Sequence, residues 1–237
     1  MIAFLNQVVY GYYPYVALSL FIGGSIIRFN RGQYGWRSGS SELLRRKQLV
    51  WGSSMFHYGI LVVLAGHFFG FLTPESVVAA SGMSEQAHAL LAIIAGGFSG
   101  LIAWVGLTML VHRRLFDIRI RRTSSAMDIF VLLLVWVQLT FGLATVPLSM
   151  HHLQSTLFTR LVAYVQGIVY LHPNAVSNLD GVYWVYRVHL FLGFTFFLVW
   201  PFSRLVHIWS APIWYLARLY QVVRRRTPQR QKRGMPT

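Results

Sequence analysis

Five long stretches of mostly apolar residues account for most of this chain and strongly limit what it can fold into. They lie near residues 8–27, 49–72, 87–111, 126–148 and 182–207. A helix that crosses a lipid bilayer needs about 20 predominantly apolar residues, so each stretch is long enough for one crossing. Charged residues make up only 11% of the 237 residues, whereas soluble domains carry about 25%. The sequence therefore predicts an all-α membrane protein, a five-transmembrane-helix bundle.

The connections between the stretches are too short for a separate soluble catalytic domain. We expect residues 1–210 to form the transmembrane domain and residues 211–237 to form a basic cytoplasmic tail. Most of the 21 Lys and Arg residues lie after the first and third stretches or near the C-terminus. The positive-inside rule then predicts a protein of the cytoplasmic membrane with its N-terminus outside and its C-terminus in the cytoplasm. Because this charge lies beside the lipid bilayer, we expect no nucleic-acid partner.

Histidine is the strong metal ligand that this sequence offers in number. There is no cysteine, which excludes disulfides, iron–sulfur clusters, thiolate metal sites and CxxCH heme attachment in this chain. His57 and His67 lie in the second apolar stretch, and His189 and His207 lie in the fifth. Ionisable side chains at membrane depth are costly, so these four histidines are candidate functional residues.

Helix direction places the four histidines at two depths. The second stretch runs outward, which puts His57 in the inner half of the membrane and His67 in the outer half. The fifth stretch runs inward, so depth pairs His67 with His189 and His57 with His207. At about 1.5 Å per residue, the first two lie some 15 Å apart along the helix axis and the last two some 27 Å apart. This mismatch predicts a kink in the fifth helix, at Pro201.

Two imidazoles that approach one iron from opposite faces of a porphyrin form a bis-histidine b heme. The pattern predicts two b hemes (heme b) enclosed by the bundle, with electron transfer as their role because both axial positions are filled. A histidine-lined transporter of metal or protons, and a cofactor-free membrane anchor, stay open as alternatives. Arg113, Arg114 and Arg204 lie near the depth of the inner heme. They are candidate partners of its propionates, although snorkelling to lipid headgroups explains them equally well.

Several motifs in the chain are specific enough to compare with known families. They are Gly32-Gln33-Tyr34 with Trp36-Arg37 and Ser40-Ser41, Phe56-His57, Gly66-His67-Phe68-Phe69-Gly70, Leu72-Thr73-Pro74, Arg113-Arg114-Leu115-Phe116, and the run Pro201-Phe202-Ser203-Arg204-Leu205-Val206-His207-Ile208-Trp209-Ser210. With these motifs, nearly the whole chain resembles the gamma, or cytochrome b, subunit of membrane-bound respiratory nitrate reductase.

The resemblance implies that His57 and His207 bind the heme nearer the cytoplasm, and that His67 and His189 bind the heme nearer the outside. It also implies an electron-transfer subunit of an oxidoreductase complex, which oxidises quinol near the outer heme. Electrons would continue to a cytoplasmic iron–sulfur beta subunit and then to a molybdenum alpha subunit that reduces nitrate. A related complex that ran in reverse would oxidise nitrite.

One position departs from the family pattern, which usually has a lysine at the quinol-site edge of the third span. Here the reference motif is Ala95-Gly96-Gly97, and the matching position, seven residues earlier, is His88. Histidine can accept a quinol proton or donate a hydrogen bond near neutral pH. We therefore expect His88 to act with Gly66 and His67 in the quinol site. An interfacial histidine that faces lipid headgroups is the alternative.

Overall fold

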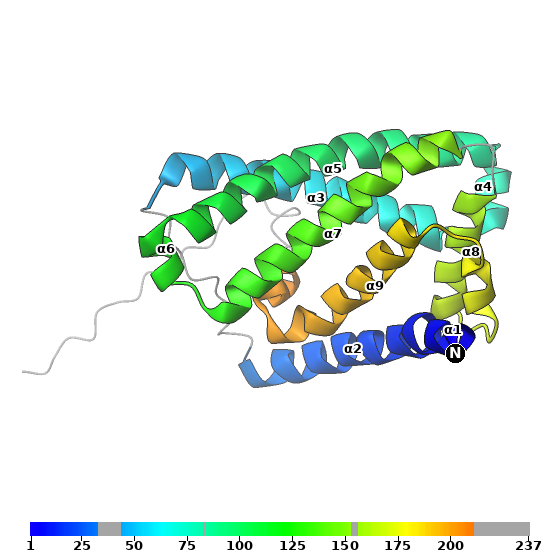
Figure 1. Cartoon of the computed structure of the whole chain (residues 1–237), viewed down its shortest axis with the longest axis horizontal. Helices are drawn as coiled ribbons and strands as arrows, with labels where there is room; N and C mark the ends of the chain where they lie inside the picture. The colour runs from blue at the N-terminus through cyan, green and yellow to red at the C-terminus, as the bar shows by residue number, and fades with distance from the viewer. Residues whose placement is uncertain (33–43, 83, 153–155, 211–237) are drawn as a thin grey trace, which may run out of the picture.

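The computed structural model describes residues 1–32, 44–82, 84–152 and 156–210, and the predicted tail 211–237 lies outside the described residues. Within the described ranges the chain is helical and contains no strand (Figure 1). Its elements are α1 (Ile2–Asn6), the π-helix η1 (Gln7–Tyr12), α2 (Tyr13–Gly32), α3 (Arg46–Leu72), α4 (Glu75–Ala80), α5 (Glu85–Phe116), α6 (Ile118–Arg122), α7 (Ala126–His151), α8 (Leu157–Val169), the 3-10 helix η3 (Ala175–Leu179), α9 (Trp184–Val199), and the 3-10 helices η4 (Trp200–Phe202) and η5 (Arg204–Ser210).

Among the described residues, four helical segments are long and apolar enough to cross a membrane by length and composition. They cover residues 46–72, 86–116, 126–151 and 184–202. These segments correspond to the second to fifth apolar stretches of the sequence, and they support a membrane protein. We call the end of the bundle that carries His67 and His189 the outer end, after the topology predicted from the sequence.

The first apolar stretch, residues 8–27, is helical but does not form one regular α-helix. It begins in the π-helix η1 and continues in α2. A π-helix bonds each N–H five residues back instead of four, so it changes the register of the side chains along the run. α2 alone is not among the four segments that meet the membrane criteria. A fifth crossing therefore stays a prediction.

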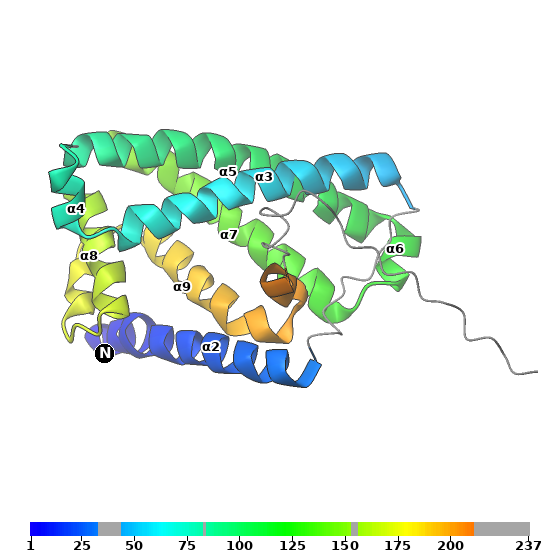
Figure 2. The ribbon, with the colours of Figure 1, turned by 180° about the vertical axis from the view of Figure 1, so that it is seen from behind.

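Glycines let α3 and α5 lie side by side along much of their length (Figure 2). A Cβ added at Gly59 would lie 2.5 Å from the Ser99 carbonyl oxygen and 2.7 Å from the Ala103 nitrogen. A Cβ added at Gly106 would lie 2.5 Å from the Phe56 nitrogen. Each of these neighbours is a backbone atom, so a side chain at Gly59 or Gly106 would force the two helices apart.

Two tryptophans and two threonines join α5 to α7 in a reciprocal arrangement. Trp104 Nε1 donates a hydrogen bond to Thr140 Oγ1, and Trp136 Nε1 donates one to Thr108 Oγ1, both at 2.9 Å. The two indole rings stack with their centroids 6.2 Å apart. Each threonine hydroxyl also donates to the carbonyl of the tryptophan one turn earlier, at 2.8 Å. These bonds satisfy polar groups at membrane depth and fix the register of α5 against α7.

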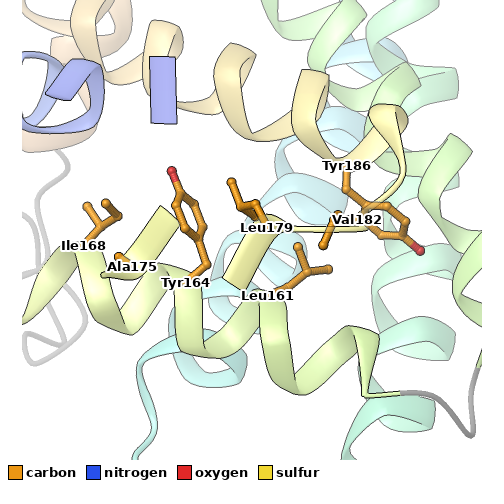
Figure 3. Packing of buried hydrophobic residues seen from close by; sticks show 7 residues of the cluster. All are labelled: Leu161, Tyr164, Ile168, Ala175, Leu179, Val182 and Tyr186. Atoms are coloured by element: carbon orange, nitrogen blue, oxygen red, sulfur yellow. The ribbon is translucent and has the colours of Figure 1, made fainter. Parts of the chain in front are cut away.

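The amphipathic helix α8 and the 3-10 helix η3 pack across the outer end of the bundle. A buried cluster joins α8 and η3 to the start of α9 (Figure 3). The cluster consists of Leu161, Tyr164, Ile168, Ala175, Leu179, Val182 and Tyr186. The Tyr164 hydroxyl points away from α8 and donates to the Tyr10 carbonyl oxygen at 2.9 Å. Gln166 Nε2 donates to the carbonyl oxygens of Phe71 and Thr73, both at 3.1 Å. α8 thus satisfies carbonyls that the end of α3 leaves without intrahelical partners.

Candidate functional site

The structure brings the four intramembrane histidines together as two pairs. The ring centroids of His67 in α3 and His189 in α9 lie 6.1 Å apart, with an interplanar angle of 47°. The ring centroids of His57 in α3 and His207 in η5 lie 6.4 Å apart, with an angle of 71°. These are the two pairs that depth predicts from the sequence. Their role as ligands of a heme stays a prediction.

The second pair forms because the fifth apolar stretch is not one continuous helix. α9 ends at Val199, just before Pro201, as the sequence predicts. Ser203 is extended, with φ −117° and ψ −178°, and the 3-10 helix η5 follows. Figure 2 shows the orange segment after α9 turned away from the α9 axis. This turn removes the mismatch in rise and brings His207 to the level of His57.

All four imidazoles are oriented in the same way, by a hydrogen bond from Nδ1 to a backbone carbonyl. The acceptors for His57, His67, His189 and His207 are the carbonyl oxygens of Ser53, Val63, Gln138 and Arg204, at 2.7, 2.8, 3.2 and 2.6 Å. A carbonyl oxygen only accepts, so the proton lies on Nδ1. The Nε2 atom of each neutral ring then keeps its lone pair, which is the form that binds a metal.

The geometry of both pairs fits a bis-histidine heme. An iron bound at about 2 Å by one imidazole nitrogen on each side separates the two ring centres by roughly 6 Å. Both observed separations, 6.1 and 6.4 Å, agree with this value. Beside His67, a Cβ added at Gly66 or Gly70 would meet no described atom within 4 Å, so this face of α3 is open to a flat group.

The four histidines form two pairs. A heme needs no more than two protein ligands, because the porphyrin nitrogens supply the other ligands of the iron. In the part of the chain that the structure describes, no group of three or more His, Asp or Glu side chains is placed to hold a bare metal ion. The imidazoles of His57, His67 and His207 are exposed on the bundle, and that of His189 is half-buried. A planar group can therefore reach them from outside the helix backbones.

One further helix, α7, holds the imidazole of His189 in place. The Gln138 carbonyl oxygen of α7 accepts a hydrogen bond from His189 Nδ1. A Cβ added at Gly142, one turn later in α7, would lie 2.9 Å from His189 Cε1. The sequence analysis identifies neither Gln138 nor Gly142. A long-range contact of this kind leaves no signal in the spacing of one sequence.

The three arginines that are candidate partners of the inner propionates lie at the end of the bundle opposite the outer end, and each has a protein partner. Arg113 is buried and donates to the Leu44 carbonyl oxygen at 2.7 Å. Arg204 forms an ion pair with Asp128, and Arg114 Nη1 lies 3.8 Å from the same carboxylate. Asp128 also closes a capping box at the start of α7. Sequence reasoning missed Asp128, although Ser125-x-x-Asp128 is a capping-box pattern.

His88 lies in the first turn of α5 and reaches the outer pair through two aromatic rings. Its ring centroid is 5.2 Å from that of Phe158 in α8, and Phe158 stacks on Phe71 at 6.3 Å. Phe71 lies 5.5 Å from His67. The structure therefore places His88 at the outer end, joined to a candidate heme ligand by van der Waals contacts. Sequence reasoning missed Phe158, because it belongs to α8 and not to an apolar stretch.

Comparison with known proteins extends the similarity over nearly the whole chain. Residues 6–226 match the family model described as "Nitrate reductase gamma subunit". The chain is 44% identical to the respiratory nitrate reductase 1 gamma chain of Escherichia coli (strain K12) over 223 residues, 94% of this chain and 99% of the relative. It is 42% identical to the nitrate reductase gamma chain of Bacillus subtilis (strain 168) over 222 residues, again 94% of this chain and 99% of the relative. The matched range includes all four paired histidines.

Proposed function

Because this chain belongs to the nitrate reductase gamma subunit family, we propose that it oxidises quinol near its outer end and delivers the electrons to cytoplasmic partner subunits. Family membership makes the chain part of an oxidoreductase complex, and its long apolar helices make it a membrane protein. The observation that carries the proposal is the arrangement of four histidines in two pairs, with ring centroids 6.1 and 6.4 Å apart and each Nδ1 bonded to a backbone carbonyl, which leaves Nε2 as the atom to bind a metal.

We propose two b hemes, one held by His67 and His189 at the outer end and one held by His57 and His207 nearer the cytoplasm. Each heme would supply an iron that takes up and gives back one electron. The backbone carbonyls that accept from Nδ1 fix each imidazole and increase the basicity of its Nε2. Because each heme would be held by two histidines, it would supply one-electron chemistry and no site for oxygen binding. This arrangement suits electron transfer.

Quinol is the proposed substrate, bound at the outer end by His88 and Gly66 beside His67. Its oxidation to quinone releases two protons and two electrons. The imidazole of His88 can take the two protons one after the other and pass each to the outer aqueous phase. The exposed face of Gly66 leaves room for a flat ring next to His67. The aromatic contacts through Phe158 and Phe71 keep His88 at a fixed distance from the outer pair.

The partners that we propose are an iron–sulfur beta subunit and a molybdenum alpha subunit on the cytoplasmic side. The relatives are named gamma chains of nitrate reductase, a designation that implies further subunits. We place the N-terminus outside and the C-terminus in the cytoplasm, since the arginine-rich segments gather at one end. Arg113, Arg114 and Arg204 lie at that end and are the proposed partners of the inner propionates. Moving each electron inward costs about 2.3 kcal/mol per 100 mV of membrane potential, so a strongly oxidising acceptor such as nitrate is required.

The test is the heme content of single-histidine variants, measured in the assembled complex by reduced-minus-oxidised spectra. We expect two low-spin b hemes in the parent protein. His67→Ala and His189→Ala should lose the same heme, and His57→Ala and His207→Ala should lose the other. His172→Ala is the control, because His172 is exposed in the outer loop. A colourless parent protein would contradict the proposal. So would a result in which the two histidines of one pair lose different hemes.

A further inference from the structure

The break between α9 and η5 leaves the Pro201 carbonyl oxygen without the partner that a continuous helix would give it. In an α-helix the Leu205 N–H would bond to the Pro201 carbonyl. Here the Leu205 N–H donates instead to Ser203 Oγ, at 3.2 Å. Ser203 Oγ and the Ser203 N–H both donate to the Trp200 carbonyl, at 2.9 and 3.1 Å. The Pro201 carbonyl oxygen must find a donor elsewhere, because an unsatisfied carbonyl at this depth costs several kcal/mol.

Arg28 of α2 donates hydrogen bonds to the carbonyl oxygens of Pro201 and Ser203. Its Nη1 atom donates to the Pro201 carbonyl oxygen and, at 3.0 Å, to the Ser203 carbonyl oxygen. The guanidinium is half-buried, whereas Arg31, nearly one turn further along α2, is exposed. Arg28 therefore does more than mark the cytoplasmic end of its helix. It bonds to the backbone at the point where the fifth apolar stretch changes direction.

Gly24, one turn before Arg28, brings α2 close enough for these bonds. A Cβ added at Gly24 would lie 2.8 Å from Pro201 Cγ and 2.9 Å from Pro201 Cβ. The proline ring cannot rotate away, and Pro201 is buried. At the neighbouring Gly23, an added Cβ would meet no described atom within 4 Å. The close approach of α2 to the break therefore depends on Gly24 and not on its neighbour.

The bonds of Arg28 are continuous with those that orient His207. Ser203 is followed directly by Arg204, whose carbonyl oxygen accepts from His207 Nδ1 at 2.6 Å. Ser203 is 2% exposed and Val206 is 1% exposed, so the segment between the break and His207 is packed on both sides. A shift of the backbone at Ser203 would move the Arg204 carbonyl, and the imidazole would move with it.

We propose that Gly24 and Arg28 are positioning residues for His207, which they hold opposite His57 through the break at Pro201. The role of His207 as a ligand of the inner heme rests on the function proposed above. The placement of η5 against α2 does not depend on that function. Arg28 touches neither a proposed cofactor nor a proposed substrate. Its effect on the inner site passes through the carbonyls of Pro201 and Ser203.

The first measurement is how tightly variants of the assembled complex retain the inner heme. Gly24→Ala and Arg28→Ala should retain the inner heme about tenfold less tightly, as expected when a group that orients a ligand is disturbed. The EPR signal of the inner heme should also shift, while the outer heme keeps its signal. Gly23→Ala and Arg31→Ala are the matched controls and should behave as the parent does. Both bonds of Arg28 come from the single nitrogen Nη1, and a lysine ammonium also offers several donors on one nitrogen, so Arg28→Lys should retain more of the inner heme than Arg28→Ala.

A second measurement needs no heme. The sequence has no cysteine, so two nitroxide labels can be placed at Val16→Cys in α2 and Ile208→Cys in η5 without background. The distance distribution between them should be narrow in the parent and in Gly23→Ala, and should shift or broaden in Gly24→Ala and Arg28→Ala. A complex without heme would defeat the proposed function but would leave this distance test in force. An unchanged distribution in both Gly24→Ala and Arg28→Ala would overturn the positioning role.

Discussion

Gly142 of α7 lies directly against the imidazole of His189, and its replacement by alanine tests how tightly that imidazole is placed. The added Cβ would lie 2.9 Å from His189 Cε1 and 3.5 Å from Nδ1. Carbon atoms come no closer than about 3.5 Å without repulsion, so the ring must move by roughly 0.6 Å. Gln138, one turn earlier on the same helix, binds Nδ1 at 3.2 Å. The ring would therefore tilt about this bond, away from the position that faces His67.

A displacement of this size exceeds the tolerance of about 0.5 Å within which a site keeps its geometry. We expect Gly142→Ala to retain the outer heme about tenfold less tightly, with the inner heme unaffected. Retention can be measured as transfer of heme to a scavenging apoprotein, followed by difference spectra. Gly97→Ala is the control, because its Cβ would meet Val146 at 3.4 Å, an ordinary contact. Equal retention of the outer heme in the two variants, with the same EPR signal, would refute this reasoning.

Two further predictions concern the packing of the bundle. Gly59→Ala should lower the free energy of unfolding by about 1–3 kcal/mol, because its Cβ would collide with the backbone of α5. Thermal unfolding in detergent measures this effect, and a melting temperature equal to that of Gly96→Ala, whose Cβ meets open space, would argue against it. Trp104→Phe should cost about 1 kcal/mol through the lost hydrogen bond to Thr140. A double-mutant cycle with Thr140→Val isolates this bond, and full additivity of the two changes would show that it contributes nothing.

The helices could be predicted from the sequence wherever one apolar stretch forms one regular helix. The third stretch, 87–111, lies within α5, and the fourth, 126–148, lies within α7. The fifth stretch, 182–207, departs from a single helix because proline cannot continue the hydrogen-bond ladder, so α9 ends at Val199. The first stretch, 8–27, departs for a reason that hydropathy cannot detect. Pro14, two residues after the end of η1, has no N–H for the Tyr10 carbonyl, and this carbonyl accepts from the Tyr164 hydroxyl instead.

The partner of each histidine could be predicted from depth, since helix direction and rise follow from the sequence. The residues that orient those histidines could not. Gln138 acts through its backbone carbonyl, which every residue has, and Arg28 bonds to carbonyls 173 and 175 positions away. The close helix contact shows the same limit. α3 approaches α5 at Gly59, which belongs to none of the motifs that the sequence offers.

α7 contacts both histidine pairs, although it contributes no histidine to either. Near its start, Asp128 holds Arg204, whose carbonyl orients His207; about 21 Å further along the axis, Gly142 bears on His189. A small tilt of α7 would therefore displace both histidine pairs together, in opposite lateral directions if the helix pivoted near its middle. A protein that pressed on the Asp128 end of α7 would thus also reach the pair of His67 and His189 at the other end of the bundle.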